Sequence, residues 1–240
     1  MIKKLAGALA VVVVLLGAGF YWFVLRDDAP EELSLDSGSG GEGSDEPAGE
    51  APGSYDGEWV VRTGGDTTAG FRIDEDFAGG VVDHEAVGRT PDVEGGITVQ
   101  GTEVPEGSFT LDLTTLEFTD DPPSGSVDGR ASAMEGQGLE TRDFPEGTFE
   151  LTEPLDLGEE PTDGFEATIE ATGDLTLHGV TNEVTFPVDA QAEGDTIRVA
   201  TSEPVPVALA DHDIEEPSAP FVASVSDEGS FEFLLELEKG

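Results

Sequence analysis

Residues 173–188 read GDLTLHGVTNEVTFPV and predict a β-hairpin. Leu175 and Leu177 fall on one face of the first strand, because successive side chains of a strand point to opposite sides. Val184 and Phe186 alternate in the same way with polar neighbours along the second strand. A glycine lies between the two runs, which is typical of a hairpin turn. We therefore expect two antiparallel strands here, each with one apolar face.

The same alternation extends in both directions along the chain. It marks residues 108–114, 148–152 and 231–237, and further strands are predicted near 58–63, 68–74, 81–90, 96–101, 165–173 and 196–201. Gly, Pro, Asp and Asn punctuate the gaps, as turns require. About ten strands with one apolar and one acidic face indicate an antiparallel sheet rolled into a β-barrel, which hides the apolar face and leaves no free edge. Only the Gly-rich region 124–141 departs from this pattern, and we expect a short helix near 130–135.

The apolar positions of these strands predict the interior of the barrel. An interior lined by phenylalanine and leucine suits an apolar guest, and it equally suits a core filled by its own side chains. The predicted lining consists of Phe109, Leu111, Leu113, Phe149, Leu151, Leu175, Leu177, Val184, Phe186, Phe231, Phe233 and Leu235.

The charge of the chain is extreme. The 240 residues include 53 acidic and 10 basic side chains, for a formal net charge of −43. Such a surface repels phosphate backbones and argues against a nucleic-acid partner. Its self-repulsion weakens a compact state at low salt and is screened at high salt, so we expect a salt-adapted (halophilic) protein. An acidic bias confined to linker and loops is the alternative.

An uncharged apolar stretch, residues 5–25, opens the chain. About 20 apolar residues in a helix cross a ~30 Å hydrocarbon core. Lys3 and Lys4 precede the stretch, which keeps the N-terminus cytoplasmic by the positive-inside tendency. We expect residues 1–27 to be an uncleaved single-pass membrane anchor and residues 57–240 to be extracytoplasmic. A cleaved signal peptide, which would make the protein secreted, is the alternative.

Residues 28–56 form an acidic Gly/Ser-rich segment with almost no apolar residue. Such a composition buries too little surface to offset the entropy lost on ordering. We expect a disordered linker with a root-mean-square span of ~30 Å, from which the domain floats off the membrane.

The hairpin quoted above resembles the signature of the YceI-like family, in which a strand, an "hGvT" turn and a second strand follow in order. Other segments resemble that family in the expected sequence along the chain: 87–90, 93–99, 109–113, 129–130, 139–141, 143–149, 213–218 and 225–233. The resemblance covers nearly all of residues 57–240. It implies an all-β, extended lipocalin-like barrel that binds an apolar lipid such as a polyprenol or an isoprenoid quinone, in secreted or periplasmic proteins.

The resemblance also draws attention to Arg130, in a chain where positive charge is scarce. One hypothesis is that Arg130 contacts the headgroup of a ligand; the other is that it pairs with some of the many acids. Where the family usually has an aspartate after this arginine, the chain has Ala131.

No residue pattern predicts catalysis. The chain has no cysteine and no G-x-S-x-G motif, and no phosphate loop or dinucleotide fingerprint is present. His84, His178 and His212 lack a second histidine at metal-ligand spacing, so we predict no metal site and no cofactor. His178 precedes the glycine of the hairpin turn, and we interpret it as structural.

These observations favour a non-enzymatic protein that sequesters or transports a long-chain apolar lipid outside the cytoplasm. The alternative is an envelope structural or interaction module with a packed barrel and an acidic surface. A homodimer is a possible state of either one.

Overall fold

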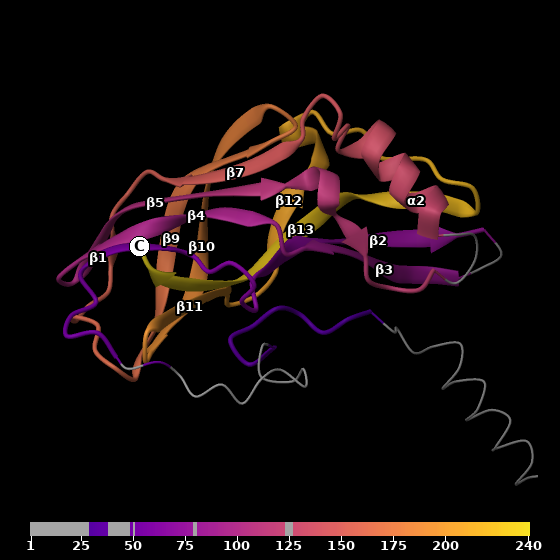
Figure 1. The fold of residues 1–240 in the computed structure, drawn as a ribbon. Coiled ribbons are helices and arrows are strands. Elements are labelled where there is room, and N and C mark those ends of the chain that lie inside the picture. The colour runs from indigo at the N-terminus through magenta and orange to yellow at the C-terminus, as the bar shows by residue number, and fades with distance from the viewer. Residues whose placement is uncertain (1–28, 38–48, 50, 79–80, 123–126) are drawn as a thin grey trace, which may run out of the picture.

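The computed structural model describes residues 29–37, 49, 51–78, 81–122 and 127–240 (Figure 1). These residues form thirteen strands in one antiparallel sheet. The strands are β1 (Gly57–Val61), β2 (Thr68–Phe77), β3 (Val81–Thr90), β4 (Val93–Gln100), β5 (Glu103–Asp112), β6 (Glu117–Phe118), β7 (Glu146–Leu151), β8 (Leu155–Asp156), β9 (Phe165–Leu177), β10 (Val180–Glu193), β11 (Thr196–Thr201), β12 (Val205–Ala208) and β13 (Val222–Lys239). The helical elements are η2 (Leu113–Thr115), α2 (Val127–Ala133), η3 (Met134–Gly138) and η4 (Leu209–His212).

The hairpin predicted from residues 173–188 is confirmed as the junction of β9 and β10, which pair antiparallel from Leu177 and Val180 outward. His178 and Gly179 form its two-residue turn, with φ angles of 50° and 75°. Positive φ at both central residues is what a type I′ turn requires, and that turn matches the twist of the flanking strands. Every strand range predicted from alternation overlaps a strand, whereas the short β6, β8 and β12 were not predicted.

Eight strands close into a barrel in the order β1-β4-β5-β7-β9-β10-β11-β13, and antiparallel pairing of β1 with β13 completes the ring. The predicted all-β antiparallel barrel is therefore confirmed. Tyr55 and Trp59 lie at the end of the barrel where β1 begins. Their rings stack with centroids 5.4 Å apart, and Trp59 is fully buried. Trp59 points inward, because its register partner Ile97 lines the interior.

At its other end the sheet extends beyond the barrel. The C-terminal half of β13 pairs with β1, and its N-terminal half pairs with β2, whose neighbours are β3 and then β6. Residues 62–67 connect β1 to β2 at this split. Helix α2 lies over the extension formed by β2 and β3 (Figure 1). Helix α2 occupies the region where a short helix was predicted. We call the end of the molecule formed by α2, β3, β6 and the C-terminal part of β2 the α2 end.

Two segments of the linker that was predicted to be disordered over residues 28–56 instead pack against the barrel. Residues 29–37, which we call the strap, lie against the outside of the sheet, where Leu33 packs on Ala200 and Leu234. Tyr55 donates a hydrogen bond to the Gly194 carbonyl at 2.8 Å. The few apolar side chains of the linker suffice for ordering because the barrel offers them apolar partners. Leu234 is one of these, an apolar residue on an otherwise acidic outward face.

The predicted membrane anchor, residues 1–27, lies outside the described residues. Within the part of the chain that the structure describes, none of the helices has the length and apolar character needed to cross a membrane.

Candidate functional site

An apolar cavity of about 180 Å³ lies inside the barrel. We call it the barrel cavity. Its walls come from β4, β5, β7, β9, β10, β11 and β13, because inward positions of neighbouring strands are aligned by their register. Phe109, Phe149 and Leu175, for example, are cross-strand partners on β5, β7 and β9. Partners on one face of an antiparallel pair lie side by side, so these side chains form one continuous apolar wall.

Phe186 lies at the centre of an aromatic cluster on this wall. Its ring centroid lies 5.4 Å from that of Phe149, 5.2 Å from that of Phe231 and 6.2 Å from that of Phe233. The rings meet edge to face, an arrangement that adds to the energy of burial alone. Phe149 fits because it covers Gly173, where a side chain would collide with the ring.

Most of the predicted lining residues meet in this cavity. Ten of them line it: Phe109, Leu111, Phe149, Leu151, Leu175, Leu177, Phe186, Phe231, Phe233 and Leu235. Leu113 lines a second cavity described below, and Val184 packs against the aromatic cluster without lining either one. Sequence reasoning missed further lining residues such as Val99, Val104, Phe165 and Val199. Several of these lie on predicted strands, where the same alternation would have identified them.

A second cavity of about 140 Å³ lies at the α2 end, and we call it the α2 chamber. Its lining includes Leu113, Phe118, Met134 and Leu139, with segment 214–219 on another side. Four residues line both cavities: Gly70, Leu111, Leu177 and Phe231. The two cavities are therefore neighbours along the long axis of the molecule.

A cluster of buried charges borders the α2 chamber. It consists of Glu75 on β2, His84 on β3, Asp120 after β6 and Arg130 on α2, and we call it the buried ion cluster. Arg130 is 3% exposed. Its Nη1 donates to Asp120 Oδ2 at 2.8 Å, and its Nε lies 3.1 Å from Glu75 Oε2. His84 Nε2 lies 2.9 Å from Asp120 Oδ2, and the Arg130 guanidinium lies 4.3 Å from the centre of the Phe118 ring.

The two carboxyl groups of this cluster respond oppositely to burial. Burial alone would raise the pKa of Asp120, but hydrogen bonds from His84, Arg130 and the Val87 amide lower it to about 2. Burial raises the pKa of Glu75, and the charge of Arg130 offsets only part of that effect. Asp120 is thus the fixed counter-ion of Arg130, because hydrogen bonds to a carboxylate favour its charged form.

Two guanidinium nitrogens of Arg130, Nε and Nη2, make no hydrogen bond, and of these only Nε has an ion-pair partner, Glu75 at 3.1 Å. Its Nη2 is buried and has no hydrogen-bond partner, although Arg130 lines the α2 chamber. A buried donor without a partner is costly, so a polar atom of a guest would be favoured there. The structure thus shows Arg130 paired with acids and also places it beside the chamber.

The other two histidines bind the protein itself. His178 Nε2 lies 2.8 Å from Glu140 Oε2, and its ring packs on Phe144. His212 Nδ1 lies 3.0 Å from the Val180 carbonyl oxygen. Both contacts hold segments next to the β9–β10 turn. No group of three or more His, Asp or Glu side chains in the described ranges is arranged to hold a metal ion.

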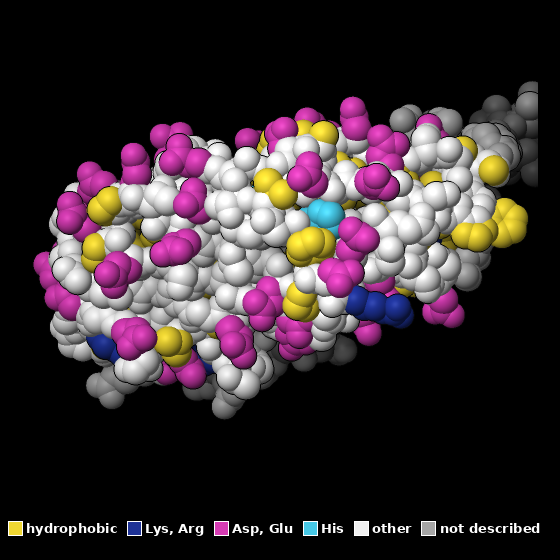
Figure 2. Space-filling view, turned by 90° about the horizontal axis from the view of Figure 1, so that it is seen from above, with side chains coloured by type: hydrophobic (Ala, Val, Ile, Leu, Met, Phe, Trp, Pro, Cys, Tyr) yellow, Lys and Arg dark blue, Asp and Glu magenta, His cyan; other side chains and the backbone are white. Residues whose placement is uncertain are grey.

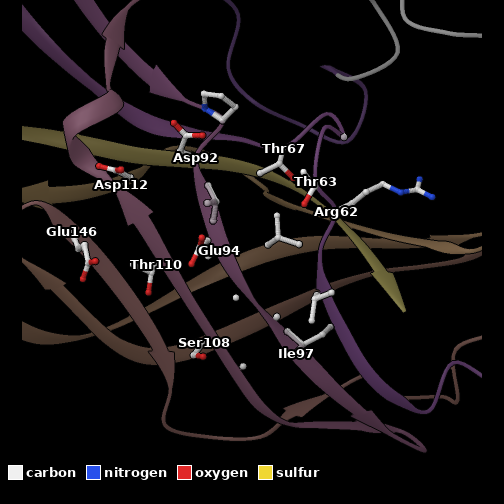
Figure 3. Close-up of a pocket in the computed structure, with 18 of the residues that line it drawn as sticks. Arg62, Thr63, Thr67, Asp92, Glu94, Ile97, Ser108, Thr110, Asp112 and Glu146 are labelled. Atoms are coloured by element: carbon white, nitrogen blue, oxygen red, sulfur yellow. The ribbon is translucent and has the colours of Figure 1, made fainter. Parts of the chain in front are cut away.

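The outside of the barrel is polar. A groove of about 1240 Å³ follows the outer face of β4 and β5 below the 62–67 loop, and Glu94, Thr110 and Glu146 point into it from three strands (Figure 3). On the face shown in Figure 2, acidic side chains are scattered over the whole length of the molecule and basic ones are few. The groove and this face therefore present oxygen atoms and negative charge, in contrast to the interior.

Comparisons with known proteins identify a family model and solved structures that resemble this chain. A family model described as YceI-like domain matches residues 59–237. A solved polyisoprenoid-binding domain from Saccharophagus degradans, implicated in plant cell wall breakdown, is similar with a TM-score of 0.57 and 19% identity, covering 76% of this chain and 98% of that one. The structure of BcnA from Burkholderia cenocepacia has a TM-score of 0.50 and 17% identity, covering 70% and 95% of the two chains. No curated protein matches the chain. At these identities the structural likeness shows the shared fold.

Proposed function

The chain belongs to the YceI-like family, and on that premise we propose that its barrel binds a long-chain apolar lipid, of the polyprenol or isoprenoid quinone type, without bond chemistry. The observation that carries the proposal is the apolar barrel cavity, which is continuous in its lining with the α2 chamber. Binding pockets are concave and mostly apolar, with few polar groups that fix orientation. The barrel cavity supplies the apolar wall, and Arg130 supplies a polar group beside the chamber.

A bound chain would need to occupy both cavities. Their volumes of about 180 and 140 Å³ reach only the lower end of the roughly 300–1,000 Å³ typical of ligand pockets. A chain that extends from one cavity to the other must pass Leu177 and Phe231, which line both. We therefore expect rearrangement of these two side chains on binding.

The buried ion cluster supports a neutral headgroup. Asp120 and Glu75 already lie against Arg130, so a phosphate placed at Arg130 Nη2 would meet two carboxyl groups as well as one guanidinium. A carbonyl or hydroxyl oxygen could accept the free Nη2 donor without adding charge. In competition for the full chain, ubiquinone should therefore displace squalene, which has an isoprenoid chain and no oxygen. Equal affinity of the two lipids, or an Arg130→Ala variant with unchanged quinone affinity, would remove the headgroup role.

Mass spectrometry of organic extracts from the purified full chain tests the lipid proposal itself. Ala171 is 4% exposed and lines the barrel cavity, so Ala171→Trp should fill the cavity and abolish lipid uptake. Glu170→Trp is the matched control, because the neighbouring side chain is exposed on the outer face of β9. A chain that carries no lipid and takes up neither polyprenol nor quinone would instead favour the alternative function, an envelope interaction module with a packed barrel. The small cavity volumes are the observation in favour of that alternative.

We further propose that residues 1–27 anchor the chain in the cell membrane as a single span, with the barrel outside the cytoplasm. The uncharged stretch 5–25 and the preceding lysines support this placement. Accessibility of the barrel to protease added to intact cells tests it. Light scattering on the purified chain tests the homodimer.

A further inference from the structure

Two large apolar side chains stand out from the surface at the α2 end. Phe221 is 60% exposed and Val127 is 36% exposed, and every other large apolar side chain whose burial the structure describes is less exposed than these two. The Phe221 carbonyl accepts a hydrogen bond from the Ala78 amide at 2.8 Å, directly after β2 ends. Val127 begins α2, which lies over the same end of the sheet (Figure 1). Figure 2 shows apolar side chains at the surface of this end.

Phe221 is the second central residue of a tight turn, in which the Val222 amide donates to the Ala219 carbonyl at 3.2 Å. Its φ angle is 75°, in the left-handed region that bulky residues rarely adopt. A backbone conformation of this kind costs free energy and tends to occur at functional sites. Here the costly conformation presents an aromatic ring to solvent, so the fold gains no burial from it. The turn accounts for the positive φ, and the 60% exposure of the ring leaves it accessible to an external partner.

The α2 chamber lies at the same end of the molecule as Phe221. At the opposite end, the stacked rings of Trp59 and Tyr55 are buried. At the α2 end, Ile214, Pro217 and Ala219 form one wall of the α2 chamber, and Phe221 follows two residues later on the same segment. A partner that contacts Phe221 would thus lie beside the chamber wall.

The contacts of the strap show in which direction the chain runs along the sheet. Glu232 is 1% exposed, and its carboxylate accepts the Leu33 amide at 2.9 Å. The guanidinium of Arg72, which pairs with Glu232, donates to the Pro30 carbonyl at 2.6 Å. Arg72 lies nearer the α2 end than Leu234, on which Leu33 packs, as the β2–β13 register shows. From Pro30 to Leu33 the strap therefore runs along the sheet in the direction that leads from the α2 end toward the closed barrel.

We propose that the α2 end is a membrane-docking surface and that its occupant is the bilayer that holds residues 5–25. This inference rests on the membrane anchor of the proposed function. Four residue steps separate Leu25 from Ala29, which span at most ~14 Å. The strap thus holds the α2 end at the bilayer, and Phe221 is its main contact, because aromatic rings favour the membrane interface. A lipid could then pass between the bilayer and the α2 chamber without crossing water.

The acids of this region select the kind of bilayer. Asp128 follows Val127, and Glu215, Glu216 and Asp227 lie on the segments that flank Phe221. These charges repel anionic headgroups, so docking depends on apolar contact with neutral or zwitterionic lipid. We expect docking to strengthen as salt screens the acids.

Site-specific quenching tests the proposal, because the chain has no cysteine and single-cysteine variants carry one label each. The full chain is reconstituted in phosphatidylcholine vesicles in molar NaCl, with bimane attached at Ala223→Cys. The matched control carries the label at Thr102→Cys. Both positions are exposed, and the β4–β5 turn that contains Thr102 lies at the other end of the molecule. Brominated phosphatidylcholine should quench the label at 223 and leave the label at 102 unaffected. Equal quenching at the two positions, or none at either, would overturn the proposal.

Two further variants separate docking from anchoring. Phe221→Ser should remove most of the quenching at 223, and so should Leu33→Asp, which places a charge in the buried strap contact. Glu32→Ala, at an exposed neighbour in the strap, should leave it unchanged. Unchanged quenching in both Phe221→Ser and Leu33→Asp would contradict the proposal. Release of the wild-type chain by alkaline carbonate would also overturn it, whereas lipid extraction from the purified chain would still decide the binding function separately.

Discussion

The barrel and the α2 end solve the problem of burial in different ways. The barrel interior buries apolar side chains around Phe186, and its register sets their neighbours. The α2 end buries charges as well, with Arg130 enclosed by Asp120 and Glu75. Apolar burial tolerates a range of partners, whereas a buried charge requires one partner at a fixed place. The barrel therefore provides volume, and the α2 end provides polar specificity.

Among the changes considered, loss of the Phe186 ring should lower the free energy of unfolding most. Phe186→Ala removes a 3% exposed side chain from contact with three other rings. Such a deletion costs roughly 3–5 kcal/mol, because a cavity remains where the ring was. Urea unfolding measures it, with the exposed Phe221→Ala as the same substitution at the surface. A loss at Phe186 as small as the loss at Phe221 would show that the barrel interior collapses around the change.

Removal of the buried cation should have a similar or slightly smaller effect at the α2 end. Arg130→Met leaves Asp120 and Glu75 buried without the guanidinium, although His84 and the Val87 amide still contact Asp120, and the loss costs about 3 kcal/mol. The exposed Arg142→Met should change the free energy of unfolding by at most about 0.5 kcal/mol. In the double variant Arg130→Met, Asp120→Asn, the loss should be smaller than the sum of the two single losses, because no charged aspartate remains. If the two single losses of unfolding free energy simply added in the double variant, Arg130 and Asp120 would not be paired.

Acid should distinguish the two regions. Asp120 has a folded-state pKa of about 2 against an ordinary value of 3.8. Its pKa is depressed, so its stabilisation is present above pH 3.8 and is lost as the pH falls through 2. The shift corresponds to about 2 kcal/mol. The difference in unfolding free energy between the wild type and Asp120→Asn should shrink by that amount between pH 6 and pH 2, while the effect of Phe186→Ala stays constant.

Glu75 should change stability in the opposite direction. Burial raises the pKa of its carboxyl group above the ordinary value of 4.5. Its contribution to stability is therefore present below pH 4.5 and declines as the pH rises through the folded-state pKa. Relative to Glu75→Gln, the wild type should lose stability as the pH rises above 4.5. A gain over this range would show that Arg130 outweighs burial at Glu75.

The strap should show a smaller and local effect. Leu33→Ala removes apolar contact with Ala200 and Leu234, at a cost of about 2 kcal/mol. Because a surface segment can open by itself, the loss should appear as faster hydrogen exchange of the amide at position 33, which Glu232 accepts. Glu32→Ala should leave that exchange rate unchanged. Equal exchange in both variants would mean that the strap is held by its backbone contacts alone.

Salt should have the smallest differential effect. With a net charge of −43, the urea midpoint of the wild type should rise between low and molar NaCl, because salt screens the acids. The urea midpoint of Phe186→Ala should rise by the same amount, because the lost ring is uncharged. A midpoint that does not rise would contradict salt adaptation.

The sequence by itself determined the barrel, its family and most of its lining. Period-two alternation identifies which side chains share a face, and ten of twelve predicted residues line the barrel cavity for that reason. The β9–β10 turn was predictable because Gly179 follows His178 at the end of an alternating run. In these segments, local pattern and tertiary position give the same answer.

Only the tertiary structure decided where the charges and the linker go. Nothing local distinguishes Asp120 from the other acids, and its partners lie on β3 and α2, 36 and 10 residues away. Leu33 meets Glu232 across 199 residues of sequence. A pair contact between distant segments depends on how the sheet splits at residues 62–67, and periodicity carries no information about that split. The strap, the buried ion cluster and the outward Phe221 are therefore properties of the folded chain, whereas the apolar interior is a property of its strands.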